Sequence, residues 1–329
     1  MTPPSNLRRS GTVRLAALAV VVGSGVLMLW SISDQRVAPR PQPLRIGINP
    51  WPGYEFAFLA EKLGYFADEG IDIRLVEFQS LGDSQLAFER GQTDGLFCST
   101  HELFEIERRD RRHPMPVLIC DTSDGGDVII GRADIHSVSD LRGRRIGYEP
   151  RTVNEYLLAR ALQQAGLTVA DIELVPGSQD QIATLFNERQ LDAIVTYPPV
   201  SLDYAEVVDA RVVFSSRDIP SEIVDLLVIE QGIAAANSVK LEAFRRAFDR
   251  AVQFHEDHPD VALTMLAGRL GLSHEEFHRA LVEDIRLVRA TDQSDMLDAS
   301  FINGLRTHKQ SVDQFFSANS SLAPEGAGP

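Results

Sequence analysis

Residues 45–54 read RIGINPWPGY, and residues 145–154 read RIGYEPRTVN. The shared Arg-Ile-Gly is the first of three landmarks that occur twice in the same order. The other two are Leu75-Val76, which returns as Leu174-Val175, and Asp94-Gly95, which returns as Asp192-Ala193. Because the offset drifts only from 100 to 98 residues, we interpret the two stretches as an internal repeat.

Each copy of the repeat predicts the order strand, helix, strand, helix, strand. In the first copy we expect strands at 44–48, 71–78 and 95–98, with helices at 54–63 and 83–90. In the second copy we expect strands at 145–148, 172–175 and 193–196, with helices at 152–165 and 180–188. A glycine, Gly64 or Gly166, ends the first helix of each copy. Strands that alternate with helices form parallel sheets covered on both faces, so the sequence predicts an α/β fold with two lobes.

The chain is expected to cross between these lobes twice. We predict that lobe 1 covers residues 44–127, that lobe 2 covers 128–230, and that 231–316 returns to lobe 1 as a helical part. Residues 226–230 form an apolar strand suited to the return, and helices are expected at 243–256, 261–270 and 273–284. Two crossings make a hinged clamshell. Ligands of open α/β sheets bind at the carboxyl ends of the strands, which places a ligand cleft between the lobes.

Both ends of the chain are expected to lie outside this fold. Residues 1–33 hold several arginines ahead of an apolar run, which is typical of a signal peptide. Cleavage after Ser33 fits the small-x-small rule, but 15–32 reaches the lower edge of a membrane span, so an uncleaved membrane anchor is the alternative. Residues 34–43 read as a linker and 317–329 as a disordered tail. The body is therefore expected in the periplasm or another extracytoplasmic space, either released or anchored.

Composition excludes several classes of protein. The 47 acidic residues against 32 basic ones give a formal net charge of −15, which argues against nucleic acid as a partner. With only Cys98 and Cys120, the chain is neither a disulfide scaffold nor a multi-cysteine zinc module. Residues 274–278 fit the zinc pattern H-E-x-x-H, but Ser273 and Glu276 form a capping box there, so no metal site is expected. Nucleophile motifs, phosphate loops and dinucleotide fingerprints are also missing from the sequence, and we expect no cofactor and no enzymatic activity.

Four segments resemble a known family. They are NPWPGYEFAFLAEKLGYFADEGIDIRLVEF (49–78), ERGQTDGLF (89–97), SVSDLRGRRIGYEPRTVNEYLLARALQQAGL (137–167) and NERQLDAIVTYPP (187–199). Together they resemble the substrate-binding proteins of ABC importers, in the SsuA/THI5-like group that covers nitrate, sulfonate, taurine and thiamine-precursor binders. The resemblance spans 44–316 and implies the type II periplasmic binding fold. It also implies a monomer that captures a small polar or heterocyclic ligand by clamshell closure for an ABC permease in the inner membrane.

Two other functions use the same fold. A ligand-sensing module anchored in the membrane would serve a membrane signalling protein, and a retained N-terminal anchor would favour that function. An enzyme of pyrimidine-forming or hydrolytic type is the third hypothesis. The cysteine-rich cluster of the yeast-type pyrimidine synthases is missing from this sequence, so the resemblance does not imply their activity.

The candidate ligand-binding residues follow strands or open helices at the expected cleft. They are Trp51, Tyr54, Ser80, Thr100, His101, Glu102, Asp124, Thr152, Asn154, Tyr197 and Asp225. Trp51 and Tyr54 either stack on a flat ligand or pack their own loop, and Tyr197 is expected opposite Trp51. Ser80 and Thr100 either contact the ligand or cap the helix that follows.

The charged candidates also have structural alternatives. His101 and Glu102 either read a polar ligand or form a first-turn pair that the helix dipole favours. Asp124 either contacts the ligand or belongs to an Asp-Gly turn. Asp225 precedes the return strand, where it either binds the ligand or supports the hinge.

The second lobe contributes a helix N-terminus and further charged residues to the expected cleft. Thr152 and Glu155 match a capping box, which leaves the backbone amides of 152–154, that of Asn154 included, to bind an anion or a carbonyl. The expected cleft collects Glu102, Asp124, Asp127, Glu149 and Asp225 against Arg151 and His101. Because carboxylates repel anions, we expect an amine or a flat nitrogen heterocycle rather than a sulfonate or nitrate.

Overall fold

The computed structural model describes residues 42–204, 207–289, 293 and 299–319. The chain divides into two units, Met1–Gln42 and Pro43–Pro329, and every element described below belongs to the second. The expected signal or anchor, most of the linker and the end of the tail lie outside the described residues. Among the helices that are described, none has both the length and the apolar character that a membrane span requires.

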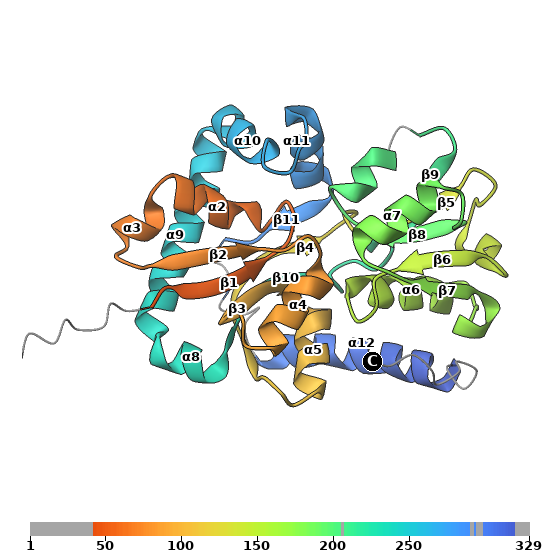
Figure 1. Ribbon diagram of the computed structural model, residues 1–329, viewed down its shortest axis with the longest axis horizontal. Coiled ribbons are helices and arrows are strands. Elements are labelled where there is room, and N and C mark those ends of the chain that lie inside the picture. Colours follow the sequence, from red (N-terminus) through yellow and green to blue (C-terminus); the bar gives the residue numbers. More distant parts are fainter. Residues whose placement is uncertain (1–41, 205–206, 290–292, 294–298, 320–329) are drawn as a thin grey trace, which may run out of the picture. The chain divides into compact units, whose positions relative to one another are not determined.

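Two β-sheets with helices packed against them build this unit (Figure 1). The first sheet has the strand order β11-β4-β10-β3-β1-β2. Its strands are β1 (Leu44–Ile48), β2 (Ile73–Glu77), β3 (Gly95–Ser99), β4 (Pro114–Ser123), β10 (Val224–Glu230) and β11 (Ile285–Leu287). The second sheet has the order β7-β6-β8-β5-β9. Its strands are β5 (Val128–Arg132), β6 (Arg145–Tyr148), β7 (Glu173–Pro176), β8 (Ala193–Thr196) and β9 (Ala210–Ser215).

Helices connect the strands of each sheet, and a helical C-terminal part follows. The first sheet carries α2 (Glu55–Lys62), α3 (Tyr65–Asp68), α4 (Leu81–Glu89) and α5 (Thr100–Arg108). The second carries α6 (Val153–Gln164), α7 (Gln179–Asn187) and the 3-10 turns η1 (Val138–Leu141), η2 (Val169–Asp171), η3 (Val200–Tyr204) and η4 (Ser216–Asp218). The C-terminal part holds α8 (Gln231–Ala236), α9 (Ser238–Asp257), α10 (Pro259–Ala267), α11 (His274–Glu283) and α12 (Ala299–Asn319).

The internal repeat is confirmed as two equivalent halves. β1 pairs in parallel with β2 and β3, as β6 does with β7 and β8, and the registers match: Ile46 faces Gly95, and Ile146 faces Ala193. The next strand, β10 in one sheet and β5 in the other, is antiparallel. The sheets are therefore mixed rather than purely parallel as expected. Both strands begin where the chain has just crossed between the lobes, at the edge of the sheet where the parallel strands end. They must therefore run in the opposite direction.

An equivalent hydrogen bond in each lobe explains why the Arg-Ile-Gly segment and the later aspartate recur together. The carboxylate of Asp94 accepts a hydrogen bond from the backbone N–H of Arg45 at 2.8 Å, and Asp192 does the same for Arg145 at 2.9 Å. In each lobe the residue ahead of the third strand thus fixes the start of the first. The predicted α/β fold of two lobes is confirmed.

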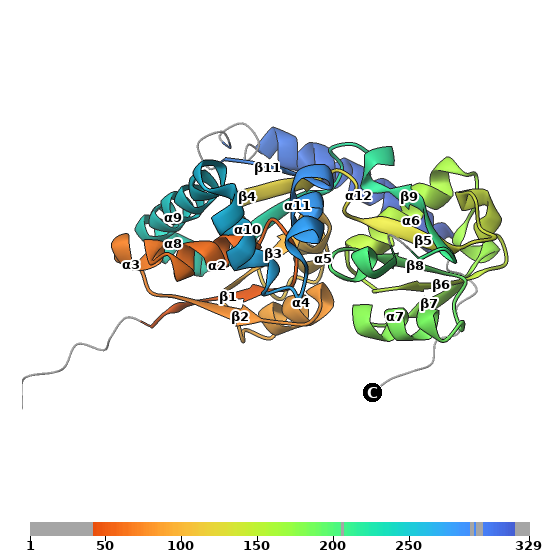
Figure 2. The ribbon, with the colours of Figure 1, turned by 90° about the horizontal axis from the view of Figure 1, so that it is seen from above.

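Three segments link the two lobes. β4 continues through residues 124–127 into β5, and β10 returns to insert between β3 and β4. The expected division at residue 230 assigned this strand to lobe 2, but its hydrogen bonds to β3 and β4 place it in the first sheet. Helix α12 packs against both α5 and α6 (Figures 1 and 2). Because α12 runs to Asn319, the first residues of the expected tail at 317–329 are helical.

The two cysteines lie on strands that are not neighbours. Cys98 is on β3 and Cys120 on β4, and β10 runs between them. Two strand spacings amount to about 9–10 Å, beyond the Cα separation of about 7 Å that a disulfide tolerates. Burial raises the pKa of both thiols well above the ordinary value, which leaves them unreactive.

We therefore expect both thiols to be reduced in the native protein. A thiol reagent should label neither cysteine in the native protein and both after denaturation without reductant. A Cys98–Cys120 cross-linked peptide in a non-reduced digest would contradict this expectation.

Candidate functional site

The facing edges of the two lobes enclose a small cavity. Its lining comes from both lobes and consists of Asn49, Trp51, Tyr54, Leu81, Asp127, Val153, Tyr197 and Asp225. The cavity measures about 10 Å³, which is room for about one water molecule. The lobes are thus closed over this site, and a ligand can enter only if they separate.

Three aromatic rings form one wall of the cavity. The ring centroid of Trp51, from lobe 1, lies 6.2 Å from that of Tyr197, from lobe 2, with the planes at 76°. Tyr54 lies 6.3 Å from Trp51 on the side of lobe 1. The expected placement of Tyr197 opposite Trp51 is what the structure shows. All three rings are buried, and each directs its polar tip at an acidic side chain.

Two of these acids stand side by side on neighbouring strands. Asp121 of β4 and Asp225 of β10 are register partners. The indole N–H of Trp51 donates to both carboxylate oxygens of Asp121 at 3.2 Å, and the Tyr54 hydroxyl donates to Asp225 at 2.7 Å. A side chain at Gly53 would clash with Asp121, since its Cβ would lie 1.8 Å from a carboxylate oxygen. Asp121 was not among the binding residues predicted from the sequence, because its position beside Asp225 depends on where β10 inserts.

A further pair of acids belongs to the crossing and to lobe 2. Asp127 lines the cavity and is buried. Glu149 accepts a hydrogen bond from the backbone N–H of Gly82, across the lobes, at 3.2 Å. The Tyr197 hydroxyl lies 3.5 Å from Glu149 and accepts from the N–H of Leu81 at 3.4 Å. The two lobes thus meet through polar contacts around the rings.

Burial controls the protonation of this acidic cluster. It raises the pKa of Asp121 and of Asp127 to about 7. Burial, together with the neighbouring charge of Asp121, raises the pKa of Asp225 well above its usual range. Burial also raises the pKa of Glu149 and brings that of Glu102 to about 8. Among the residues that line the cavity, none is lysine, arginine or histidine, so no cation of the chain balances these groups there.

Glu102 takes the position at which the backbone amides of 152–154 were expected to bind an anion or a carbonyl. One of its carboxylate oxygens caps α5 by accepting from the N–H of Ser99, and the other accepts from the N–H of Val153 at the start of α6. The Asn154 N–H is bonded to the Thr152 hydroxyl. The expectation of free amides at 152–154 is therefore wrong, because a side chain from the opposite lobe occupies the helix start.

The predicted capping box of Thr152 and Glu155 is also wrong in its second half. Thr152 caps α6, but the Glu155 carboxylate accepts from the backbone N–H of Arg151 at 2.7 Å. Arg151 has a positive φ of 65°, which turns that N–H toward Glu155. Its guanidinium contacts Glu89 of α4 at 2.7 Å instead of the cavity.

The remaining candidates lie beside the cavity or away from it. Ser80 caps α4 by accepting from the N–H of Asp83 at 3.3 Å. Thr100 and His101 line a different pocket, where the His101 ring packs edge-on against Tyr156, 5.9 Å between centroids. Burial lowers the pKa of His101 well below its usual value, so its imidazole is neutral.

Asp124 and Asn154 complete the account of the candidates. Asp124 forms an ion pair with Arg286 at 2.6 Å and lies outside the cavity. The side-chain oxygen of Asn154 accepts from the N–H of Glu149 at 3.2 Å and from Gln179 at 2.7 Å. Of the predicted residues, the structure brings Trp51, Tyr54, Tyr197 and Asp225 together in the cavity. The role of all eleven in binding stays a prediction.

The H-E-x-x-H pattern at residues 274–278 begins with the capping box that its sequence predicts. The Ser273 hydroxyl accepts from the N–H of Glu276 at 3.2 Å, and the Glu276 carboxylate accepts from the N–H of Ser273 at 2.8 Å. His274 and His278 thus lie in an ordinary helix start.

Two lobes of this topology, closed around a site at the strand ends, define the fold of the periplasmic binding proteins. The alkanesulfonate-binding protein SsuA from Xanthomonas axonopodis pv. citri, solved with MOPS, superimposes with a TM-score of 0.72 at 20% identity, over 87% of this chain and 96% of that one. The desulfurization enzyme DSZB gives a TM-score of 0.57 at 17% identity, over 84% and 92%. Most of the solved neighbours are binding proteins, and DSZB shows that the fold also serves enzymes.

The chain belongs to the NMT1/THI5-like family, whose model matches residues 51–262. A protein of Brucella abortus (strain 2308) that is named as a binding protein is 23% identical over 240 residues, which is 68% of this chain and 70% of that protein. The family resemblance predicted from the sequence is confirmed.

Proposed function

We propose that the protein is an extracytoplasmic solute-binding protein that captures a small ligand with a protonated nitrogen, an amine or a flat nitrogen heterocycle, for an ABC permease. The observation that carries this proposal is a cluster of buried carboxyl groups beside three aromatic rings, in a cavity that no basic side chain lines. Asp121 opposite Asp225 is a cross-strand pair of acids that would repel each other if both were ionised, and like charges in such positions weaken a sheet. Such a pair is typical of a functional site rather than of a structural one.

A cation between the lobes would relieve this arrangement. It would let the acids ionise, and each charge-assisted hydrogen bond contributes about 1.5–3 kcal/mol. The rings of Trp51 and Tyr197 would offer their faces to the cation and to any flat ring that bears it. An anion would meet Coulomb repulsion from the same acids and would find the start of α6 already held by Glu102.

The proposal treats the protein as a receptor rather than as an enzyme. The cavity groups acids and rings, and the residues that line it include no serine or cysteine that a base could activate. Incubation with each ligand that binds, followed by product analysis, tests this point. Conversion of a bound compound into a product would contradict the receptor proposal and would indicate an enzyme with this fold.

A thermal-shift screen tests the ligand class directly, since a ligand that binds the folded state raises the melting temperature by mass action. We expect stabilisation by polyamines or aminopyrimidines and none by sulfonates, nitrate or taurine. Asp225→Asn should abolish the shift without loss of fold, because asparagine resembles the protonated acid. Asp110→Asn is the matched control, since Asp110 is exposed and its positive φ of 52° suits asparagine. A response to anions only would overturn the proposed ligand class.

Ligand binding should change the dimensions of the protein. In solution the lobes must open to admit a ligand, because the closed cavity has room for about one water. Small-angle scattering should therefore show a smaller radius of gyration at saturation with a ligand found in the screen. An unchanged radius would argue against closure around the links at residues 124–127 and at β10.

The location outside the cytoplasm rests on the basic and apolar N-terminal sequence. N-terminal sequencing of the protein from membrane and soluble fractions distinguishes a cleaved, released protein from one that keeps an N-terminal anchor. A chain that begins at Asp34 is a released receptor, and an intact chain in the membrane is an anchored one. An intact chain in the cytosol would contradict the proposal.

A further inference from the structure

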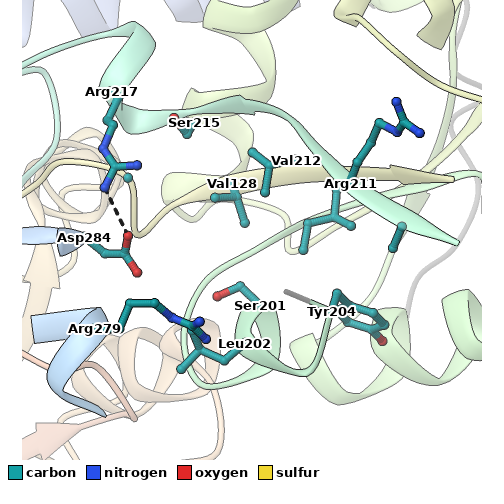
Figure 3. A pocket seen from close by; sticks show the side chains of 13 residues that line it. Val128, Ser201, Leu202, Tyr204, Arg211, Val212, Ser215, Arg217, Arg279 and Asp284 are labelled. Atoms are coloured by element: carbon teal, nitrogen blue, oxygen red, sulfur yellow. Dashed lines mark hydrogen bonds and ion pairs between the residues drawn. The ribbon is translucent and has the colours of Figure 1, made fainter. Parts of the chain in front are cut away.

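A second cavity, of about 310 Å³, lies beside the link between the lobes (Figure 3). This volume is at the lower end of the range of about 300–1,000 Å³ that small-molecule sites occupy. Its walls are largely apolar and come from β5, β9 and η3 of lobe 2. They include Val128, Ile130, Leu202, Tyr204 and Val212.

Two arginines and one acid stand at one end of this cavity. Arg217 is already engaged, since it donates to the Glu283 carbonyl and to the Asp284 carboxylate at 3.3 Å. Arg279 of α11 is different: within the described part of the chain it forms no hydrogen bond and no ion pair. Figure 3 shows its guanidinium beside Leu202 at the edge of the apolar wall. The cavity thus combines an apolar surface with a guanidinium that has no direct partner among the described residues, although the nearby carboxylates of Glu276 and Asp284 act on it through their charge.

We propose that this cavity binds a small organic anion with a short apolar chain. Arg279 would hold the anionic head through its planar donors, and the chain would lie along Val128, Leu202 and Val212. The cation comes from the C-terminal helices of lobe 1, and the wall comes from lobe 2. The site is complete only while the lobes are together, so its occupant would favour the closed arrangement.

The turn between the lobes separates this site from the aromatic cavity. A Cβ at Gly126 would lie 2.8 Å from the Trp51 ring, and one at Gly125 would lie 2.7 Å from the Arg217 guanidinium. The two glycines thus form a thin partition with the indole on one side and the guanidinium on the other. The second site goes beyond the proposed function: it is distinct in position and takes the opposite charge.

Titration calorimetry with hexanoate tests the proposal on the whole exported chain, with acetate and hexylamine as comparison probes. We expect hexanoate to bind at least about tenfold more tightly than acetate, because only hexanoate reaches the apolar wall. Arg279→Ala should weaken hexanoate binding by about tenfold or more. Arg111→Ala, which removes an equally charged exposed residue outside the cavity, should leave it unchanged.

A second variant keeps the proposal falsifiable if Arg279→Ala disturbs α11. Val212 is 56% exposed, so Val212→Glu is compatible with folding and places a carboxylate in the wall. This variant should also abolish hexanoate binding. Three results would overturn the proposal: no binding of hexanoate to the unmodified protein, affinity that neither variant reduces, or affinity that Trp51→Ala reduces as strongly as Arg279→Ala. Failure of the amine proposal leaves this test intact, because the probe charge and the variants differ.

Discussion

Affinity for a protonated amine should rise by about tenfold per pH unit for each proton that binding releases. The rise should become shallower as the pH passes about 7, where Asp121 and Asp127 ionise without a ligand. Below that pH burial keeps Asp121 and Asp127 protonated, so an incoming cation must displace a proton. Above it, the cation finds a carboxylate already formed. An alkylamine stays protonated throughout, so the titration belongs to the protein.

The stability of the unliganded protein should change in the opposite direction. Burial raises the pKa of Asp127 from 3.8 to about 7 and that of Glu102 from 4.5 to about 8. Between the ordinary pKa of each acid and its raised pKa in the folded protein, the folded protein binds more protons than the unfolded chain. The free energy of unfolding therefore falls as the pH rises. This stabilisation is complete below about pH 4 and is lost by about pH 8. Separation of the lobes limits the loss because it solvates the acids.

Two measurements check these expectations. Titration calorimetry from pH 5 to 8, in buffers with different ionisation enthalpies, gives both the affinity and the number of protons released. Asp127→Asn should lower the affinity and flatten its pH profile, whereas Asp110→Asn should change neither. Denaturant unfolding over the same pH range gives the stability. An affinity that is flat with pH, or stability that increases toward pH 8, would refute the protonation scheme.

Truncation of Trp51 should have the second-largest effect, on both binding and stability. The side chain is 4% exposed, touches Tyr54 and Tyr197, and donates its N–H to Asp121. Trp51→Ala should weaken amine binding by about 1–3 kcal/mol through lost burial and ring contact. It should also lower the free energy of unfolding by about 3–5 kcal/mol, as large-to-small changes in a packed interior do.

Conservative variants distinguish the contribution of the aromatic ring from that of its hydrogen-bonding group. Trp51→Phe keeps an aromatic face and loses the donor to Asp121, so affinity should fall by less than in Trp51→Ala. Tyr197→Phe keeps its ring and loses the hydroxyl that meets the N–H of Leu81. Calorimetry and denaturant unfolding on each variant give the two free energies. Affinity that survives Trp51→Ala in a folded protein would show that the ring only packs the loop.

The sequence predicts the parts of the fold that the repeat contains. Strands β1 to β3 and β6 to β8 occur where the two copies predict them, because each copy carries its own landmarks. β9 was not predicted, and α12 was covered only by the general expectation of a helical part at 231–316. β9 is an edge strand with Val212 exposed, so it lacks the apolar run of a buried strand. β11 has only three residues, too few for a periodic pattern.

The site was predictable where a residue's role follows from its strand alone. Trp51 and Tyr197 leave equivalent edges of the two lobes, so the repeat places them on opposite sides of the cleft. Asp121 was missed because its partner Asp225 arrives on a strand that is distant in the chain and antiparallel. Glu102 was expected in the cleft, yet no local pattern shows that its carboxylate reaches the backbone of Val153 in the other lobe. Contacts of this kind are decided by how the lobes meet.

Helix α12 gives the lobes an additional attachment outside the aromatic cavity. It lies across α5 and α6, and the buried ammonium of Lys309 ties it to Glu105 of α5 at 2.6 Å. When the lobes swing apart, the contact with α6 is therefore the one that must slide. We expect this contact to restrict how far the two lobes can separate. We therefore expect the C-terminal helix to limit the size of the molecule that can reach the rings.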